Sequence, residues 1–485
     1  MFKGVNPLTK IRNIEQIKAK TNIHLILEYL GIDTQGQKMI CCPLHGEKTP
    51  SFSIYNEGKN WTCFGECNTG GDGIKLVQLY KGISYYEAVQ EVGNLVGIQP
   101  EFSNISEAEL AEMQSRSRIE KVLEKLNDYF RENLWATIST DSDKARDYLF
   151  SERLVDRELA HIYEIGYAPW DYTDILIEMV ENGDITLEEL IEFRLLGTKD
   201  IEIPTRTNVY CTFKNRITIP VIENGRIIGI IGRDIDKDAV SKYMKIGYTD
   251  YWDGIVWRGG EQLEGHLEGH VLHIIEGQFD ALTVKQCGID NIWSVNGVHS
   301  LTPRVVEKIK KMSPDKIYIH LDWDSTGEKA ETQWAEKLGH RGYIVPSING
   351  LKDNNGKEIK DINRLFSFLY EQEKANGSDD ETAFSNTIDM VLTNLQSRIE
   401  KAENLIDIEF SKWESIEDEI LKAEGLERLI EVVYKQYSGN PEMLSLFYEK
   451  QLKPLKIGKG NFDKYIKKFE KEVNLVPYKH GQGLE

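Results

Sequence analysis

The sequence has few cysteines, no long apolar run and no excess of basic charge. Six cysteines in 485 residues are too few for a disulfide-built scaffold, and a chain of this length can bury a core without such cross-links. No stretch approaches the roughly 18 to 20 unbroken apolar residues that a membrane span requires. The N-terminus lacks the apolar region of a secretory signal. We therefore expect a cytoplasmic protein without membrane association, built from about two to four domains.

The net charge of −20 at first argues against a nucleic-acid partner, because a polyanion is bound through basic groups. The acidic residues are unevenly distributed, however. Residues 101–200 contain 24 acidic and 11 basic residues, and residues 371–485 contain 23 and 16, whereas residues 201–370 contain 23 and 22. The near-neutral stretch includes several of the motifs described below. We therefore expect a polyanion to be bound locally, through a few basic side chains and metal ions.

Hydrophobic periodicity predicts the order of secondary structure in the first half of the chain. Helical spacing covers residues 11–32 and 73–93, and residues 106–135 form a long amphipathic helix that links or braces two domains. From residue 212 the pattern changes to period two. Two apolar runs flank Asn224-Gly225, a pair that favours the tight turn of a β-hairpin.

Strands and helices alternate from residue 270 to residue 345. A Thr302-Pro303 pair within this region is typical of a helix start. The βαβα order predicts a parallel sheet that binds ligands at the carboxyl ends of its strands. Residues 374–384 have the composition of a solvated linker, and an acidic helical segment follows. The fold class predicted for the whole chain is multidomain α/β.

A group of cysteines and one histidine has the spacing of a zinc site. Cys42-Pro-Leu-His45 is separated by seventeen residues from Cys63-Phe-Gly-Glu-Cys67. Zn²⁺ prefers four nitrogen or sulfur ligands in a tetrahedron, and a set supplied entirely by protein indicates a structural site. The alternative is a set of buried, unligated cysteines, which paired spacing disfavours. Cys41 competes with Cys42 for the metal, but the Cys-x2-His spacing favours Cys42.

Aromatic and basic residues surround these ligands. Aromatic rings interleaved with bases can stack on unpaired nucleotides. We expect most of these rings to form the small core of the zinc module, with one or two exposed. The residues concerned are Lys48, Phe52, Tyr55, Lys59, Trp61 and Phe64.

Acidic residues follow three of the predicted strands. Glu276 ends one strand, and Asp322 and Asp324 end another, where alternate residues point the same way. Asp361 follows the next βα unit. Clustered carboxylates repel one another unless a cation neutralises them, and hard oxygen ligands select Mg²⁺ or Mn²⁺. Such a site can bind a triphosphate and assist in-line nucleotidyl transfer. A solvated sheet edge is the alternative.

The motifs together resemble those of a known family. The cysteine–histidine region, residues 42–67, resembles the zinc ribbon of bacterial and phage DNA primases. Glu276-Gly-Gln-Phe-Asp280 and Asp322-Trp-Asp324-Ser-Thr-Gly327 resemble the TOPRIM motifs shared by primases, topoisomerases and some nucleases. Residues 214–220, 229–233 and 241–243 resemble the primase subdomain that precedes TOPRIM, and Arg153 with residues 166–169 fits the segment before it.

The resemblance implies five segments. A zinc-ribbon DNA-binding domain covers residues 1–100 and a helical linker covers residues 101–140. The N-terminal catalytic subdomain covers residues 141–270, and the TOPRIM domain, with a Rossmann-like parallel sheet, covers residues 271–370. A helical domain occupies residues 381–485. This last segment lacks a phosphate-binding loop, so a fused helicase is not expected; in relatives the corresponding region docks on the replicative helicase.

The resemblance also implies an activity and roles for residues. It implies synthesis of short RNA primers from NTPs on single-stranded DNA, with structural Zn²⁺ and catalytic Mg²⁺ or Mn²⁺. Glu276, Asp322 and Asp324 bind the catalytic metal, and Asp361 is a further acidic contributor. The residues implied for template and nucleotide binding are Arg153, Asn215, Arg216, Arg233 and Lys242.

Two positions depart from the family pattern. The second cysteine pair has three intervening residues where primases usually have two, and Arg258-Gly259 stands where relatives commonly have Lys-Gly. The alternative function is a TOPRIM-type nuclease or another DNA-processing enzyme. A topoisomerase needs a tyrosine nucleophile in a large strand-passage domain, for which the chain has little room. An inert DNA-binding adaptor does not need the full acidic set.

Overall fold

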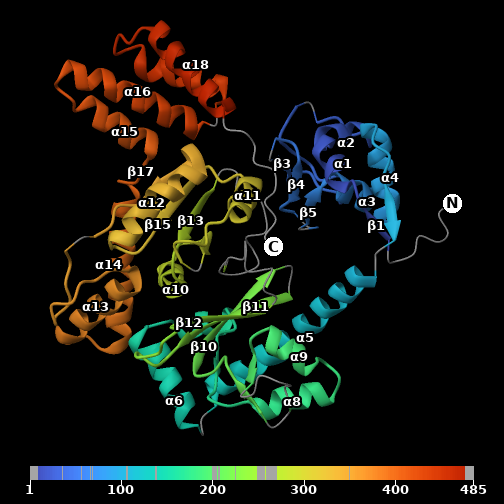
Figure 1. Cartoon of the computed structure of the whole chain (residues 1–485), viewed down its shortest axis with the longest axis vertical. Helices are drawn as coiled ribbons and strands as arrows, with labels where there is room; N and C mark the ends of the chain where they lie inside the picture. The colour runs from blue at the N-terminus through green and yellow to red at the C-terminus, as the bar shows by residue number, and fades with distance from the viewer. Residues whose placement is uncertain are drawn as a thin grey trace. The chain divides into compact units, whose positions relative to one another are not determined.

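The computed structural model describes residues 9–475 except 35, 56, 66, 68, 105–106, 137–138, 199–204, 206–207, 224–225, 248–256, 258–269, 296, 349 and 438. The side chains of residues 9, 104–113 and 472–475 are also outside this description. The chain divides into two units, Met1–His270 with Thr302–Pro314, and Val271–Leu301 with Asp315–Glu485. Each unit has its own sheets, which Figure 1 shows, and its own clusters of buried apolar residues.

The first unit begins with a small zinc-ribbon module. A four-stranded antiparallel sheet has the order β2-β3-β4-β5. A second, two-stranded sheet pairs β1 (Thr9–Ile11) with β6 (Phe102–Asn104). The strands of the larger sheet are β2 (Met39–Ile40), β3 (Phe52–Tyr55), β4 (Asn60–Cys63) and β5 (Gly70–Asp72).

The helices of this module are shorter than their periodicity predicts. Residues 11–32 form two helices, α1 (Ile14–Lys20) and α2 (Ile23–Tyr29). The second starts at Asn22, whose side chain accepts a hydrogen bond from the His24 N–H and so caps it.

The helix predicted over residues 73–93 is likewise two helices, α3 (Gly73–Lys81) and α4 (Tyr85–Val96). Gly82 ends α3 in a left-handed conformation with a φ of 63°, and Ser84 starts α4 with a capping box. Apolar spacing continues through both helices, which is why periodicity alone did not reveal the break.

The larger subdomain of the first unit, which follows the ribbon in the chain, is built around the predicted hairpin. Strands β10 (Arg216–Glu223) and β11 (Arg226–Asp234) pair antiparallel, which confirms that prediction; the turn residues 224–225 lie outside the described part of the chain. The sheet order is β12-β11-β10-β7. Its outer strands are β7 (Gly166–Ala168) and β12 (Tyr243–Gly247).

A single helix, α5 (Glu107–Trp135), packs against β7 and β11 of this sheet (Figure 1). The apolar stripe predicted for it is buried, with Ile119, Leu123, Leu126 and Phe130 at most 1% exposed. They share one hydrophobic cluster with hairpin residues. Much of the segment 101–140 therefore belongs to the core of this subdomain.

Short elements complete the first unit. They are α6 (Thr140–Arg146), the π-helix η1 (Asp147–Glu152), α7 (Arg157–Ile162), α8 (Thr173–Glu181), α9 (Leu187–Glu192), the paired strands β8 (Leu196–Thr198) and β9 (Val209–Cys211), and α11 (Pro303–Met312). Thr302 caps α11 and Pro303 is its first residue, as the sequence predicts.

The second unit contains the predicted parallel sheet. Its order is β14-β13-β15-β16-β17. The first four strands are parallel, and β17 pairs antiparallel with β16, a strand that the sequence did not predict. The strands are β13 (Val271–Ile275), β14 (Ile292–Ser294), β15 (Lys316–His320), β16 (Gly342–Ile344) and β17 (Glu403–Asn404). The helices between them are α10 (Gln278–Gln286), α12 (Ser325–Leu338), the 3-10 turn η4 (Gly339–Arg341) and α13 (Ile362–Ala375).

Residues 374–384 do not form the predicted linker. Helix α13 continues to Ala375, and α14 (Asp380–Ile399) begins directly after its cap Asp379 and packs back on α13. Polar composition alone did not distinguish this short helix–helix connection from a longer linker.

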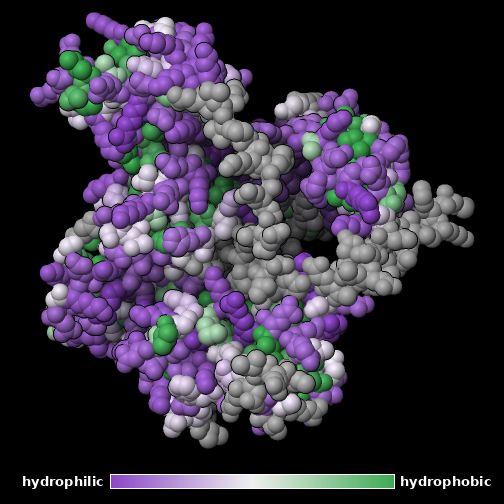
Figure 2. All heavy atoms as spheres, viewed as in Figure 1, coloured by the Kyte–Doolittle hydropathy of each residue, from purple (hydrophilic) through white to green (hydrophobic). Residues whose placement is uncertain are grey.

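The remaining segment is helical, as predicted, and has a hydrophobic core of its own. Its elements are α15 (Leu405–Glu414), α16 (Glu419–Gln436), α17 (Pro441–Phe447), the π-helix η5 (Tyr448–Leu452) and α18 (Lys459–Leu475). Among the described residues, no helix combines the length and apolarity needed to cross a membrane. Figure 2 shows a largely hydrophilic surface on the face viewed, with apolar residues in small separate groups.

Candidate metal centres

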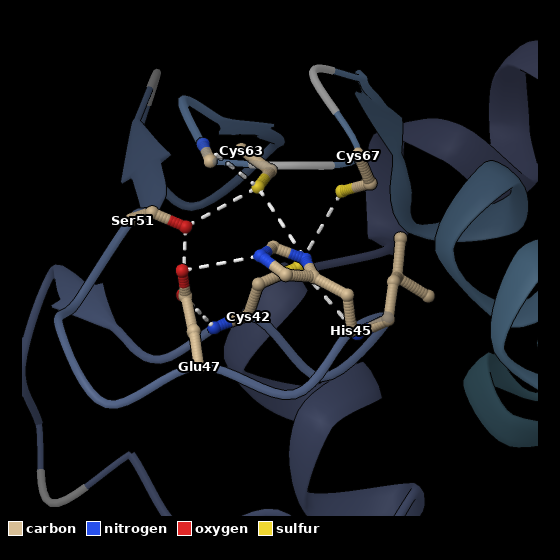
Figure 3. Close-up of polar contacts among 8 residues, drawn as sticks. Cys42, His45, Glu47, Ser51, Cys63 and Cys67 are labelled. Carbon is tan, nitrogen blue, oxygen red and sulfur yellow. Dashed lines mark hydrogen bonds and ion pairs between the residues drawn. The ribbon is translucent and has the colours of Figure 1, made fainter.

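The four predicted zinc ligands converge in the ribbon. Their ligand atoms all lie within 4.8 Å of one another. The Sγ atoms of Cys42 and Cys67 are 3.7 Å apart, and Cys63 Sγ lies 3.9 Å from His45 Nδ1 (Figure 3). Cys41 is exposed and outside the group. The set of three sulfur ligands and one nitrogen ligand matches the Cys₃His type of tetrahedral Zn²⁺ site.

A carboxylate and a hydroxyl orient these ligands, and neither was singled out from the sequence. Glu47 Oε2 lies 3.1 Å from His45 Nε2, which leaves Nδ1 turned toward the cysteines. Glu47 Oε1 accepts hydrogen bonds from the Cys42 N–H at 2.5 Å and the Ser51 hydroxyl at 2.6 Å. Such a partner selects the histidine tautomer and strengthens a metal ligand. The signal in the sequence was an acid two residues after the histidine.

The unusual spacing of the second cysteine pair is accommodated within the ribbon. The Gly65 N–H points to Cys63 Sγ at 3.2 Å. A Cβ at Gly65 would lie 2.7 Å from Ser51 Oγ and 2.9 Å from Glu47 Oε2, so a side chain there would displace the polar groups that orient the ligands. Cys67 lies within the ligand group in spite of the additional residue.

The thiols of the group differ in their acidity. Burial raises the pKa of Cys42 to about 12. Burial also acts to raise the pKa of Cys63, but hydrogen bonds, the largest from the Ser51 hydroxyl, outweigh it and the net pKa is lowered. Metal binding requires thiolates, so a cation at this site has to displace the Cys42 proton.

The second candidate centre is at the carboxyl edge of the parallel sheet. Glu276 follows β13 and Asp322 follows the adjacent strand β15. Glu276 Oε2 accepts a long hydrogen bond from the Asp322 N–H at 3.4 Å. Asp324 caps α12 and Asp361 caps α13. The structure thus brings the predicted acidic residues to neighbouring strand ends and helix starts.

Burial and mutual repulsion make two of these carboxyl groups harder to ionise. Burial, followed by the charges of Glu276, Asp361 and Asp324, raises the pKa of Asp322 to about 7. Burial also raises the pKa of Glu276, and the charge of Asp324 adds to this effect. Like charges resist joint ionisation, and a bound cation relieves this repulsion.

The oxygen donors of this group favour a hard, partly hydrated cation. Mg²⁺ usually keeps several water ligands and takes one or two carboxylates. The residues present fit a divalent cation bound partly through water.

Close packing determines the conformation of the aspartate loop. A Cβ at Gly327 would lie 2.0 Å from the Asp322 carbonyl oxygen, so only glycine fits there. Asp324 Oδ1 accepts hydrogen bonds from the N–H groups of Thr326 and Gly327, at 2.9 and 3.1 Å. Lys360 Nζ lies 3.9 Å from Asp324 Oδ2.

Two other residues of the acidic motifs have a supporting role. Asp280 Oδ1 accepts a hydrogen bond from the Asn363 N–H at 2.9 Å, and the Asn363 side chain donates to Thr283 at 3.0 Å. These bonds join α10 to the start of α13, where Asp361 lies. Asp280 therefore positions the third acidic loop.

Among the residues predicted to bind template and nucleotide, two arginines meet. Arg153 and Arg233 both donate through Nε to the Tyr148 hydroxyl, at 3.0 and 3.1 Å. Arg233 also stacks over the Tyr243 ring, 4.7 Å from its centroid. Tyr148 was not singled out from the sequence. Lys242 is exposed.

Asn215 and Arg216, in contrast, are each only 5% exposed. Tyr167 donates to Asn215 at 3.0 Å, and Asn215 donates to Asp234. Arg216 pairs with Asp234 at 3.1 Å. In this structure their polar groups therefore support the hairpin.

Arg258, which stands where relatives commonly have a lysine, lies outside the described residues.

Comparison with known proteins places these features in one family. Residues 9–109 match the model described as CHC2 zinc finger, residues 129–253 match the DNA primase catalytic core, N-terminal domain, and residues 273–365 match the Toprim-like model. By its domains, the chain belongs to the DNA primase family. The family relationship agrees with the order of motifs in the sequence.

Several curated DNA primases are similar to this primase-family chain. The protein from Aquifex aeolicus is 31% identical over 329 residues, which cover 66% of this chain and 60% of the relative. Those from Lactococcus lactis and Escherichia coli K12 are 26% and 28% identical, over 69% and 57% of this chain and 51% and 46% of the relatives. The chain thus spans about half the length of the relatives it matches.

Two solved structures share the fold. The zinc-binding and RNA polymerase domains of Aquifex aeolicus primase align with a TM-score of 0.50 and 23% identity, covering 93% of this chain and 98% of that chain. A DNA primase domain from Pseudomonas aeruginosa aligns with a TM-score of 0.50 and 17% identity, covering 72% and 99%. The likeness supports a multidomain α/β architecture.

Proposed function

We propose that the chain synthesises short RNA primers on single-stranded DNA from NTPs, by metal-assisted nucleotidyl transfer. The observation that carries this proposal is the group of carboxylates at adjacent strand ends, with the pKa of Asp322 raised to about 7, in a chain with primase family domains. Mg²⁺ or Mn²⁺ at such a site activates a hydroxyl and neutralises phosphate charge. Glu276, Asp322 and Asp324 hold the ion, and Asp361 adds charge.

The ribbon holds one structural Zn²⁺ through Cys42, His45, Cys63 and Cys67. Its closed ligand set assigns it to template selection and leaves the chemistry to the acidic centre. Phe64, beside Cys63, is 56% exposed, whereas Phe52 and Trp61 stack in the ribbon core with centroids 4.8 Å apart. Among the aromatic residues around the ligands, Phe64 is therefore the best placed to stack on an unpaired base.

Basic residues of the catalytic subdomain bind the template and the nucleotide phosphates. Arg153 and Arg233 converge on Tyr148, so two guanidinium groups act at one place. Lys242 adds an exposed charge. Asn215 and Arg216 contribute by holding the hairpin that carries Arg233.

The C-terminal helices are proposed, by analogy with relatives, to dock on the replicative helicase. A cytoplasmic location is part of the same proposal, because replication takes place there in bacteria.

The test is incubation of the full chain with single-stranded DNA, labelled NTPs and Mg²⁺. Short RNA that depends on both template and metal is expected. Asp322→Asn keeps the side-chain volume and removes one ligand charge, so the rate should fall by about two orders of magnitude, roughly 3 kcal/mol of barrier. Degradation of the DNA without RNA synthesis would favour a TOPRIM-type nuclease instead. Near-parental RNA synthesis by folded Asp322→Asn and Glu276→Gln would remove the acidic centre from the mechanism.

A further inference from the structure

The segment after the Toprim-like match contributes to the sheet that carries the acidic centre. The match ends at residue 365, whereas α14 packs on α13 and β17 extends the sheet through the pairs Tyr343–Asn404 and Ile344–Glu403. Residues 380–404 are therefore part of the catalytic sheet layer, although the family model does not include them.

One residue of α14 extends from this segment to the aspartate loop. Arg398, in the last turn of the helix, is only 7% exposed. Its guanidinium carbon lies 4.7 Å from the centroid of the Trp323 ring, and its Nε donates to the Pro346 carbonyl at 2.6 Å. Trp323 is 5% exposed and is the residue between Asp322 and Asp324.

The backbone of Trp323 connects the two acidic loops. Its N–H donates to the Lys360 carbonyl at 2.5 Å, directly before Asp361. The next N–H, that of Asp324, donates to the Asp322 carbonyl at 2.9 Å. A displacement of the Trp323 side chain would therefore move backbone that carries Asp322, Asp324 and Asp361.

Burying Arg398 carries an energetic penalty that its surroundings offset only in part. Burial lowers its pKa to about 10, against the opposing charge of Glu331. Its Nη1 has no hydrogen-bond partner within the described part of the chain. Burial, with the charge of Glu328, raises the pKa of Glu331 to about 7 in spite of Arg398. An apolar residue often stabilises such a position better than a buried charge, so stability alone does not account for this arginine.

We propose that Arg398 is a positioning residue for metal binding: its planar guanidinium fixes the Trp323 ring and, through it, the loop that presents Asp322 and Asp324. The inference rests on the proposed function for its catalytic meaning. It also makes the helical segment after the Toprim-like region necessary for a fully formed acidic centre. Arginine suits this task because its planar group stacks on an aromatic face while donating a hydrogen bond.

The test compares variants of the full, zinc-loaded chain in Mn²⁺ binding and in RNA synthesis. Mn²⁺ is titrated by electron paramagnetic resonance, and the acidic centre is defined as the binding that Asp322→Asn removes. Arg398→Gln should weaken this binding roughly tenfold and raise the metal concentration for half-maximal synthesis accordingly. Arg398→Lys, which keeps the charge, should recover only part of the loss. Trp323→Leu should weaken binding in the same way, and combining it with Arg398→Gln should add little.

Val391→Ala is the matched control, a substitution at a fully buried position of the same helix. It should lower the unfolding temperature and leave Mn²⁺ affinity unchanged. If Arg398→Gln and Arg398→Lys lower only the unfolding temperature, as the control does, the proposal is overturned. If Arg398→Gln fails to fold, Arg398→Lys and Trp323→Leu decide the question in the same way. Mn²⁺ binding by a parent chain that makes no RNA would refute the proposed function and leave this comparison intact.

Discussion

At the scale of single residues, main-chain hydrogen bonds hold the acidic side chains in place. Glu276 accepts from the Asp322 N–H, Asp324 caps α12, and Asp361 accepts from the Arg364 N–H at 2.6 Å. These carboxylates therefore do not separate freely to relieve their repulsion. Their repulsion therefore lowers the stability of the metal-free protein, and a bound cation restores that stability. Such a loss of stability is common at functional sites.

Asp322 should make the metal-free protein less stable as pH rises. Burial and neighbouring carboxylates raise its pKa from 3.8 to about 7. Its contribution to stability is therefore full below pH ~4 and is lost as pH rises through about 7. In Mg²⁺-free buffer, Asp322→Asn should lose this dependence and unfold at a higher temperature than the parent at pH 8, with a smaller difference at pH 5. Thermal unfolding measures both, and an equal difference at the two pH values would contradict the assignment.

Glu47 should tighten zinc binding without contacting the metal. It fixes the His45 ring and hydrogen-bonds to the Cys42 N–H. Glu47→Gln should therefore weaken zinc affinity about tenfold or more, measured by competition with a chromogenic chelator. Glu15→Gln, an exposed change in the same module, is the control and should leave affinity unaltered. Equal affinity in both variants would show that the histidine needs no such partner.

At the scale of elements, the proposed function assigns separate tasks to the ribbon and to the parallel sheet. The ribbon presents turn-borne ligands from β2 to β5, and the sheet presents carboxylates at the ends of β13 and β15. Each arrangement follows from local geometry, since a short antiparallel sheet brings its turns together and parallel strands align their carboxyl ends.

Loss of zinc should therefore affect initiation more than extension. In a Cys63→Ser, Cys67→Ser double variant the remaining two ligands cannot hold the ion, and about one Zn²⁺ per chain should be lost by metal analysis. RNA synthesis on bare single-stranded DNA should fall strongly, while extension of a preannealed primer should largely persist. An equal loss of both reactions would contradict the division of labour.

At the scale of the whole molecule, the negative net charge limits how tightly a nucleic-acid template can bind. A net charge of −20 disfavours tight binding of a polyanion, so we expect template binding to depend on a few basic side chains such as Arg153 and Arg233. Weak, local binding agrees with the proposed function, in which the template is released after a short product.

The salt dependence of template binding should reflect these few contacts. Each phosphate contact to a single strand contributes about 0.7 to the slope of log affinity against log salt. A slope of about 2 to 3 is expected for the parent, and Arg153→Gln or Arg233→Gln should each reduce it by somewhat less than 1. Fluorescence anisotropy with a labelled oligonucleotide measures the slope. A slope near 10, or one unchanged in both variants, would show that other groups bind the strand.

The sequence by itself determined the order of elements and the residue types of both candidate centres. Strand ends, turn residues and paired ligands are local patterns, and local geometry turns them into a hairpin, a βαβ sheet and a four-ligand group. For this reason the sequence alone reveals the ligand pairs in residues 42–67 and the acidic motifs at Glu276 and Asp322. The division of residues 73–93 into two helices was not predicted, because the apolar spacing runs through Gly82.

Only the tertiary structure decided which side chains far apart in the sequence contact one another around the candidate functional residues. It put Tyr148 between Arg153 and Arg233, buried Asn215 and Arg216, and brought Arg398 onto Trp323. It also added β17 to the sheet, a two-residue strand too short to have a recognisable pattern. The physical reason is the same in each case: contacts between residues far apart in the chain depend on how the layers pack, and no spacing within the sequence records that packing.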